Sequence, residues 1–186
     1  NNYLKPHGLF FPVDVSTANR ATLGGMAGNN SCGSRSIRYG NMVHNVRAID
    51  ALMADGSEVQ FNSLASRQVN GENASHAELF NKLLDLGARE AAEIAQRFPN
   101  LLRRVGGYNI DVLTKDKPNM SHLLVGSEGT LAFFQRIHLN LQVIPEHKVL
   151  GVCHFPSFYK AMDATQHIVE LNPSAVELVD RTMINL

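Results

Sequence analysis

The sequence predicts a globular chain of the α+β class, and three observations support this prediction. Two β-prone runs flank the turn signal Asp55-Gly56, apolar residues recur at helical spacing over 76–98, and apolar and polar residues alternate over 137–143. With 186 residues, of which 44% are hydrophobic and 18% charged, the chain is long enough for one good core and part of a second domain.

The first expected element is a short buried strand within residues 9–13. The apolar run GLFFPVD ends there in turn chemistry at Pro12 and Asp14. A glycine-rich segment follows, with five glycines between Thr22 and Gly40. This composition favours close approach of the backbone over a packed helix or a regular strand.

The middle of the chain predicts a hairpin and two helices. The run RAIDALMADGSEVQF places two strands around Asp55-Gly56, a common turn signal. Over 76–98, leucines and then smaller apolar residues recur every three or four positions. Gly87 is the expected break between two short helices, and Pro99 is the expected stop.

The last third of the chain predicts strands on both sides of a helix. The alternation over 137–143 is the clearest strand in the sequence, and VLGVCHF at 149–155 and AVELV at 175–179 have strand composition. An amphipathic helix is expected over 157–171. This β-α-β order predicts that a second domain begins near Lys148.

The glycine-rich segment ATLGGMAGNNSCGSRSIRYG, residues 21–40, suits the binding of an anionic cofactor. Its glycines remove side chains, so main-chain N–H groups can converge on a phosphate, and Thr22, Ser31 and Ser34 offer hydroxyl groups. No Lys-Ser or Lys-Thr pair follows the glycines, which disfavours nucleoside triphosphate hydrolysis. A long irregular surface loop is the alternative interpretation.

A second candidate motif is GSEGTL, residues 126–131. A tight turn there would present N–H groups and Thr130 at the edge of the following strand, although an ordinary turn has the same composition. RYG at 38–40 and GYN at 107–109 place an aromatic or cationic group beside glycine. Such a group suits either the cover of a planar ring or a packed turn.

The composition excludes several classes of function. The balance of 17 basic and 17 acidic residues leaves no footprint for nucleic acid, and no apolar run approaches the roughly 18 residues of a transmembrane segment. Cys32 and Cys153 form no CxxC and no disulfide framework, which favours a reducing compartment. The eight histidines show no HxH, HExxH or HxxxH pairing, so we expect no metal site and a small-molecule partner.

The motifs occur together in an order that resembles one family. PVDVS at 12–16, ATLGG at 21–25, NNSCGS at 29–34, RYG, the Asp-Gly hairpin, GYN and GSEGTL follow one another along the chain. This order resembles that of the FAD-linked oxidases of the vanillyl-alcohol oxidase (PCMH) type, particularly the D-lactate, glycolate and D-2-hydroxyglutarate dehydrogenases. NNSCGS and RRVGGYN are most similar to the long members in which this flavin module is fused to an iron–sulfur region.

The resemblance implies two domains in an α+β fold. Residues 1–147 would form the second subdomain of a PCMH-type FAD-binding domain, and residues 148–186 the start of a ferredoxin-like cap domain. The first FAD subdomain would precede Asn1, and a histidine motif that binds a divalent metal and the substrate would follow Leu186. Because the chain also opens without methionine and stops on an apolar pattern, we expect a fragment of a longer protein.

The resemblance also assigns FAD-binding residues by their position in these motifs. They are Thr22, Leu23, Gly24 and Gly25 at the pyrophosphate and ribityl region, Gly33 and Ser34 closing the same loop, Pro12, Asp14 and Ser16 along the cofactor, Glu128, Gly129, Thr130 and Leu131 on its other side, and the backbone of Ile137 by the adenine.

The implied reaction is oxidation of a D-2-hydroxy acid, in which the C2 hydride passes to flavin N5 and the electrons pass on to an acceptor protein or domain. The resemblance places no base within the chain, so we assign no catalytic residue and expect the isolated chain to bind FAD weakly and to be inactive. Two alternatives stay open. One is another flavoenzyme of this type, either an oxidase that uses O2 or one similar to alkylglycerone-phosphate synthase, and the other is a non-catalytic module for a different phosphate ligand. We expect a cytoplasmic location, with peripheral contact to the inner face of a membrane as a second option.

Overall fold

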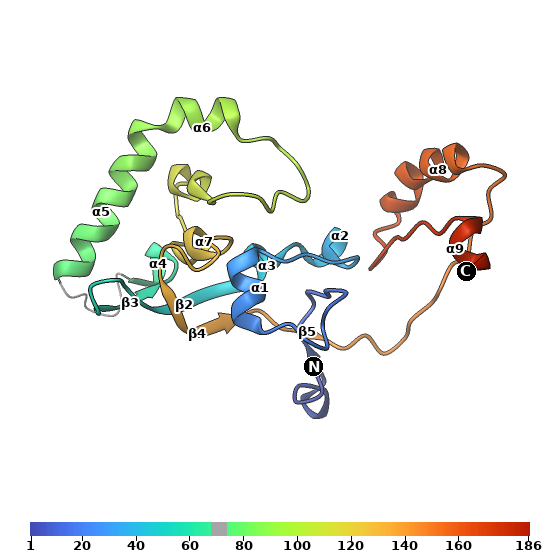
Figure 1. Ribbon diagram of the computed structural model, residues 1–186, viewed down its shortest axis with the longest axis horizontal. Helices are drawn as coiled ribbons and strands as arrows, with labels where there is room; N and C mark the ends of the chain where they lie inside the picture. Colours follow the sequence, from blue (N-terminus) through green and yellow to red (C-terminus); the bar gives the residue numbers. More distant parts are fainter. Residues whose placement is uncertain (68–73) are drawn as a thin grey trace.

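The computed structural model describes residues 1–67 and 74–186 and contains two small antiparallel sheets together with helices (Figure 1). In the larger sheet β2 lies between β3 and β4, and in the smaller sheet β1 pairs with β5. The strands are β1 Leu9–Phe10, β2 Val46–Leu52, β3 Glu58–Phe61, β4 Phe133–Leu139 and β5 Gln142–Val143. This mixture of helices and antiparallel sheet belongs to the α+β class, as the sequence predicts.

Most helices of the described chain are short, and α5 and α8 are the long ones. The α-helices are α1 Leu23–Asn29, α2 Ser36–Tyr39, α3 Met42–Asn45, α4 Leu64–Arg67, α5 Ala74–Arg89, α6 Ala91–Arg97, α7 Ser121–Leu124, α8 Phe158–Glu170 and α9 Arg181–Asn185, and the 3-10 helices are η1 Lys5–His7 and η2 Ile110–Thr114.

The hairpin predicted around Asp55-Gly56 is confirmed. Strands β2 and β3 pair antiparallel, and Gly56 turns the chain with φ at +83°. The Asp55 carboxylate accepts hydrogen bonds from the backbone N–H and the hydroxyl of Ser57, at 2.9 and 2.6 Å. A short polar side chain and a glycine therefore close the turn, as the composition predicts.

The core lies on one face of the larger sheet. Ile49 is fully buried in the central strand, opposite Phe61 on β3 and Ile137 on β4. Phe80 of α5 meets Phe61 edge-on, with the ring centroids 5.2 Å apart, which is a favoured geometry for aromatic pairs. The other face of this sheet carries polar residues such as Asp50, so the strands alternate as a half-buried antiparallel sheet does.

The two predicted helices before Pro99 are present as α5 and α6, but the predicted break at Gly87 is wrong. Gly87 lies inside α5, and the helices separate at Glu90. A Cβ at position 87 would stand 2.5 Å from the Cβ of Leu113 in η2. The glycine therefore allows close packing of two segments and does not end the helix.

The expectation that the glycine-rich segment avoids helix is also wrong for its first part. Residues Leu23–Asn29 form α1, which buries Met26 and Ala27 in the core. The Thr22 hydroxyl accepts a hydrogen bond from the Gly25 N–H at 3.0 Å and so caps the helix. This cap and the burial of one helix face outweigh the roughly 1 kcal/mol that each glycine costs a helix.

The strand predicted over 137–143 is divided between the two sheets. Strand β4 begins earlier, at Phe133, and ends at Leu139, while residues 142–143 pair with β1 as β5. Because the chain changes its partner strand between the two, the predicted alternation does not continue. Val143, expected on the buried face, is 75% exposed. The predicted strand within 9–13 is likewise reduced to Leu9–Phe10.

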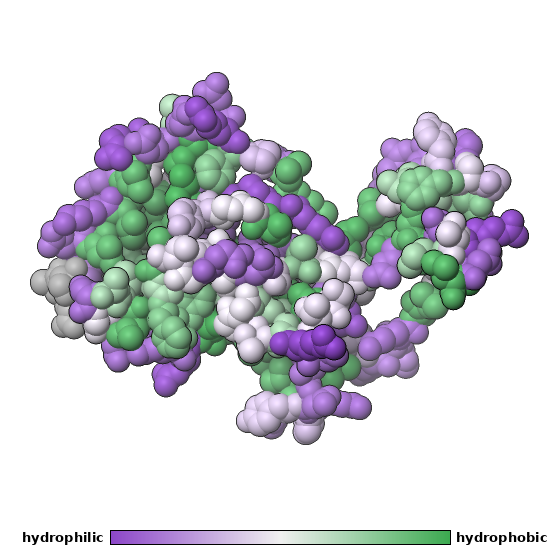
Figure 2. Space-filling view, in the orientation of Figure 1, coloured by the Kyte–Doolittle hydropathy of each residue, from purple (hydrophilic) through white to green (hydrophobic). Residues whose placement is uncertain are grey.

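The last part of the chain extends away from the larger sheet and carries α8 and α9 (Figure 1). The helix predicted over 157–171 is confirmed by α8, which the Ser157 hydroxyl caps. The strands predicted at 149–155 and 175–179 are absent, since no strand of the described chain lies beside these segments to bond with them. Apolar residues of these segments are exposed, such as Val149 at 96%. Figure 2 shows apolar surface on this last part of the chain.

Within the described residues, every helix is too short or too polar to cross a lipid bilayer.

Candidate functional site

The candidate site begins at the N-terminus of α1. Leu23, Gly24 and Gly25 form its first turn and are exposed, whereas Met26, Ala27 and Gly28 are buried. Apart from its chain neighbours and the nearby backbone of the helix, no atom lies within 4 Å of the place where a Cβ on Gly24 would stand. The first N–H groups of a helix have no partner within the helix and favour an anion. At Gly24 this turn therefore offers polar backbone to the solvent without a side chain of its own.

The second predicted motif lies directly against α1. The N–H of Gly126 donates to the Ala27 carbonyl at 2.9 Å, and the N–H of Glu128 donates to the Gly28 carbonyl at 3.0 Å. The Asn29 amide also donates to the Glu128 carboxylate at 2.9 Å. The two motifs are about 100 residues apart in sequence, and hydrogen bonds join them into one surface.

The turn at 126–129 depends on backbone conformations in the left-handed region. Gly126, Glu128 and Gly129 have φ values of +86°, +52° and +75°. Glycine adopts this region without strain, and Glu128 is held in it by its two contacts with α1. Gly129 is exposed, and a Cβ on it would meet no atom within 4 Å. The turn therefore adds a second open stretch of backbone beside the helix.

A third segment, GYN, completes this surface. The Tyr108 hydroxyl lies 2.7 Å from the Thr130 hydroxyl, which in turn donates to the Ser127 carbonyl at 2.5 Å. The buried Asn109 amide donates to the Val125 carbonyl at 2.8 Å. Of the two interpretations of GYN, its contacts support the packed turn, with Tyr108 still 44% exposed.

The glycine loop after Cys32 is held by Asp14. The two carboxylate oxygens accept hydrogen bonds from the Arg35 N–H at 3.0 Å and the Ser34 hydroxyl at 2.9 Å. The Gly33 backbone passes so close that a Cβ there would lie 1.4 Å from the Asp14 carbonyl oxygen. The loop that follows α1 therefore packs against Asp14 through Gly33 and Ser34.

The remaining predicted residues are placed differently. Pro12 is fully buried, and Ile137 packs against the core from β4. Leu131 is half-buried against the same core, and Ser16 is exposed. The structure therefore places residues 126–128 against the end of α1, the helix whose first turn holds Leu23 to Gly25, and sets these four residues apart from that contact. Contact of any of these residues with a cofactor stays a prediction.

Asn30, which the sequence patterns did not single out, connects three segments. It is 1% exposed and left-handed at φ +53°, its Oδ1 accepts from the Val43 N–H at 3.0 Å, and its Nδ2 donates to the Arg104 carbonyl at 3.3 Å. The signal was available in the Asn-Asn pair at the end of the glycine run, because asparagine tolerates left-handed backbone at helix ends.

Three histidines, His44, His122 and His138, line a separate, open cavity of about 720 Å³ beside the larger sheet. Burial lowers the pKa of His122 to about 4, and its Nε2 lies 3.3 Å from the Val46 carbonyl oxygen. Burial and the nearby Lys115 ammonium lower the pKa of His44. Both imidazoles are therefore neutral at pH 7, and no group of three metal-ligating side chains occurs among the described residues.

The chain is similar to known flavin-linked proteins. A family model described as "FAD binding domain" matches residues 1–62, and one described as "FAD linked oxidases, C-terminal domain" matches residues 144–186. The chain is 35% identical to D-2-hydroxyglutarate dehydrogenase of Haemophilus influenzae and 31% identical to that of Escherichia coli, over its full length and 19% of each relative. It is 32% identical to a probable mitochondrial D-lactate dehydrogenase of Danio rerio, over its full length and 29% of that protein. The chain thus spans between about a fifth and three-tenths of the length of these relatives.

Proposed function

Because the chain belongs to the FAD-linked oxidases of the vanillyl-alcohol oxidase (PCMH) type, we propose that it forms one wall of the FAD site in an enzyme that oxidises a D-2-hydroxy acid. The substrate class is taken from the names of the relatives, which are D-2-hydroxyglutarate and D-lactate dehydrogenases. The surface built by α1 and residues 126–130 is the proposed contact with the cofactor.

The single observation that carries this proposal is the open space at Gly24. A glycine in a helix costs roughly 1 kcal/mol relative to alanine, and here no neighbouring atom requires it. A ligand that approaches the backbone more closely than a Cβ allows would account for it. FAD fits, since its pyrophosphate is an anion and the first turn of a helix attracts anions.

The residues around Gly24 have distinct proposed roles. Thr22 ends the extended chain and fixes the direction in which the first N–H groups of α1 point, because its hydroxyl caps the helix. Leu23, 48% exposed, would offer apolar contact, and Gly25, whose N–H donates to the Thr22 hydroxyl, would border the cofactor. Across the surface, Glu128 to Thr130 would contact the cofactor through backbone, since the Glu128 and Thr130 side chains already have partners.

Asp14, Gly33 and Ser34 are proposed to act indirectly. The Asp14 carboxylate is occupied by the loop it holds, so it would shape the path of FAD rather than bind the cofactor through its charge. Pro12, Ser16 and Leu131 would border that path, and the Ile137 backbone would lie toward the adenine. When bound, the flavin would supply the hydride acceptor of the reaction. No residue of the chain is proposed as its base.

We further propose that residues 1–147 are the second subdomain of the FAD-binding domain and residues 148–186 the start of a ferredoxin-like cap domain. The match of the C-terminal family model to residues 144–186 supports this division. So do the exposed apolar side chains of the two expected strands, for which further strands of a cap sheet would be the partner. The electron acceptor and the cellular compartment stay predictions of the sequence.

Titration with FAD tests the proposed function. The 186-residue chain is expected to shift the visible flavin band and to raise its own melting temperature as FAD is added, because a ligand stabilises the folded state that binds it. We expect weak binding and no oxidation of D-lactate or D-2-hydroxyglutarate by the chain alone. A flavin spectrum and a melting temperature that both stay unchanged at saturating FAD would contradict the proposal.

A further inference from the structure

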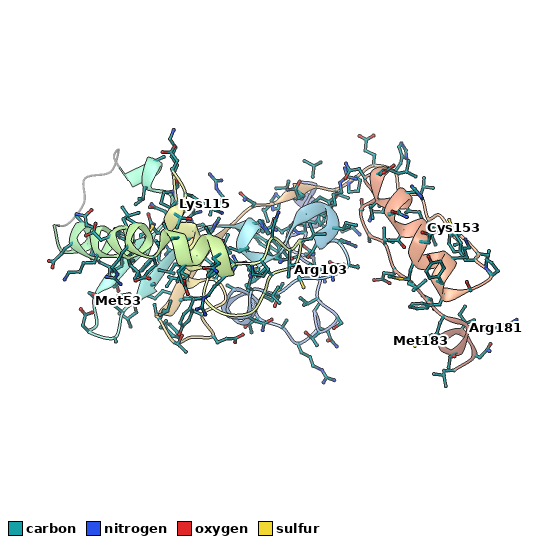
Figure 3. All side chains as sticks on the ribbon, turned by 90° about the horizontal axis from the view of Figure 1, so that it is seen from above. Met53, Arg103, Lys115, Cys153, Arg181 and Met183 are labelled. Atoms are coloured by element: carbon teal, nitrogen blue, oxygen red, sulfur yellow. The ribbon has the colours of Figure 1, made fainter. Side chains whose placement is uncertain are left out.

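The connector between α6 and η2, residues 98–109, crosses beside both glycine-rich segments. Four of its apolar side chains are substantially exposed, so little burial holds it in place; they are Leu101, Leu102, Val105 and Tyr108, at 62%, 69%, 39% and 44%. Figure 3 labels Arg103, which extends from this connector toward the first glycine segment. A small set of hydrogen bonds from the middle of the connector and from its last two residues therefore fixes it in place.

The first attachment is to the segment that follows α1. The Arg103 guanidinium donates from Nη2 to the Gly33 carbonyl at 2.8 Å. One residue further on, the Arg104 carbonyl accepts from the buried Asn30 amide at 3.3 Å. The Arg104 guanidinium in turn lies 2.6 Å from the Asp111 carboxylate in η2, which anchors the middle of the connector.

The second attachment is to the turn at 126–130, and its direction follows from the hydroxyl chemistry. The Thr130 hydroxyl has one hydrogen, which it donates to the Ser127 carbonyl. The Tyr108 hydroxyl must therefore donate to the Thr130 oxygen, 2.7 Å away. Next to it, the buried Asn109 amide donates to the Val125 carbonyl. The hydrogen bond of Tyr108 is exposed to solvent, and the hydrogen bond of Asn109 is buried.

We infer that the connector 98–109 is a clasp that keeps the two glycine-rich segments together and limits how often the surface between them opens, with Arg103 and Tyr108 as positioning residues. The segments share only a few direct bonds, among them those from the Gly126 and Glu128 N–H groups to α1. The clasp fastens to both segments at once, so releasing one end lets them separate. Its relevance to FAD release rests on the proposed function.

Amide hydrogen exchange of the 186-residue chain without any ligand tests the clasp directly. Tyr108→Phe removes one hydroxyl and keeps the ring, and Tyr159→Phe, at a 72% exposed tyrosine in α8, is the matched control. In Tyr108→Phe the Gly126 and Glu128 amides should exchange roughly fivefold faster, the factor expected for one lost hydrogen bond, while the control matches the parent. Arg103→Gln should give a comparable rise from the other end of the clasp.

A purely local role for Tyr108 would change exchange near residues 107–109 and leave the Gly126 and Glu128 amides as in the parent. That result in both variants would overturn the clasp. An FAD titration of the same proteins then separates the two proposals. If the parent binds FAD, Tyr108→Phe should release it several times faster, and an unchanged release rate counts against the clasp. If the parent binds no FAD, the proposed function fails, and the exchange rates still decide the clasp.

Discussion

Gly24→Ala should stabilise the folded chain and at the same time weaken FAD binding, which are opposite effects from one methyl group. Position 24 is helical, exposed and free of neighbours within 4 Å, so the added Cβ meets nothing in the chain. Alanine in place of glycine stabilises a helix by up to about 1 kcal/mol, which for a chain of this size raises the melting temperature by about 2–4 °C. A cofactor resting on the same backbone would meet that methyl group.

Gly33→Ala supplies the contrasting change. The new Cβ would lie 1.4 Å from the Asp14 carbonyl oxygen and 2.4 Å from its Oδ1, so the two backbones must separate by about 2 Å to reach ordinary contact. That movement removes the hydrogen bonds from the loop to the carboxylate, each contributing roughly 1.5–3 kcal/mol. We expect a loss of about 3–5 kcal/mol in the free energy of unfolding.

Differential scanning calorimetry and FAD titration of the parent and both variants check these two predictions. For Gly24→Ala the expected pair of results is a higher melting temperature and at least about tenfold weaker FAD binding, which corresponds to 1.4 kcal/mol. A lower melting temperature would show that Gly24 has a structural role within the chain. A stable Gly24→Ala variant that binds FAD as the parent does would refute contact between the first turn of α1 and the cofactor.

Three further predictions concern stability, measured as the free energy of unfolding in urea. Asp14→Ala should lower the free energy of unfolding by about 2–4 kcal/mol, because both carboxylate oxygens accept hydrogen bonds from Ser34 and Arg35. A loss below about 0.5 kcal/mol would contradict that role. The pKa of His122 is about 4 in the folded state and 6.5 in the unfolded state, so as the pH falls the unfolded state binds the proton before the folded state does. The contribution of neutral His122 to the free energy of unfolding should therefore be full above about pH 6.5 and fall by up to roughly 3 kcal/mol as the pH approaches 4. In His122→Gln this pH dependence should be weaker. Ile49→Ala should cost about 2–5 kcal/mol, since the side chain is fully buried in the central strand, and a smaller loss would show that the sheet closes the cavity.

Local patterns predicted several elements correctly where the signal and its cause are close in sequence. The hairpin around Asp55-Gly56 needs only a polar cap and a left-handed glycine, both within four residues. Helix α8 combines a Ser157 cap with apolar spacing on one face. Expectations failed where a distant residue decides the outcome. Gly87 is a glycine because of Leu113, not because a helix ends there.

The strands predicted at 149–155 and 175–179 also failed because distant residues decide whether a strand forms. Alternation and β-branched residues favour extended chain, but a strand exists only where a neighbour accepts its backbone hydrogen bonds. In the described chain these segments lie without such a neighbour. The strand expected over 137–143 was divided because its two ends pair with different strands, β2 and β1.

The sequence by itself determined the chemistry available to this protein: glycines and hydroxyl groups in two motifs, no charge excess and an order of motifs that resembles one flavoenzyme family. Only the tertiary structure decided that the two motifs form one surface, since the bonds from Gly126 and Glu128 to α1 join residues about 100 positions apart. It also decided that Asp14 holds a loop and that Asn30 and Tyr108 connect segments. The physical reason is that glycine and asparagine indicate which backbone conformations a position allows, whereas the contacts that make such a conformation necessary come from residues elsewhere in the fold.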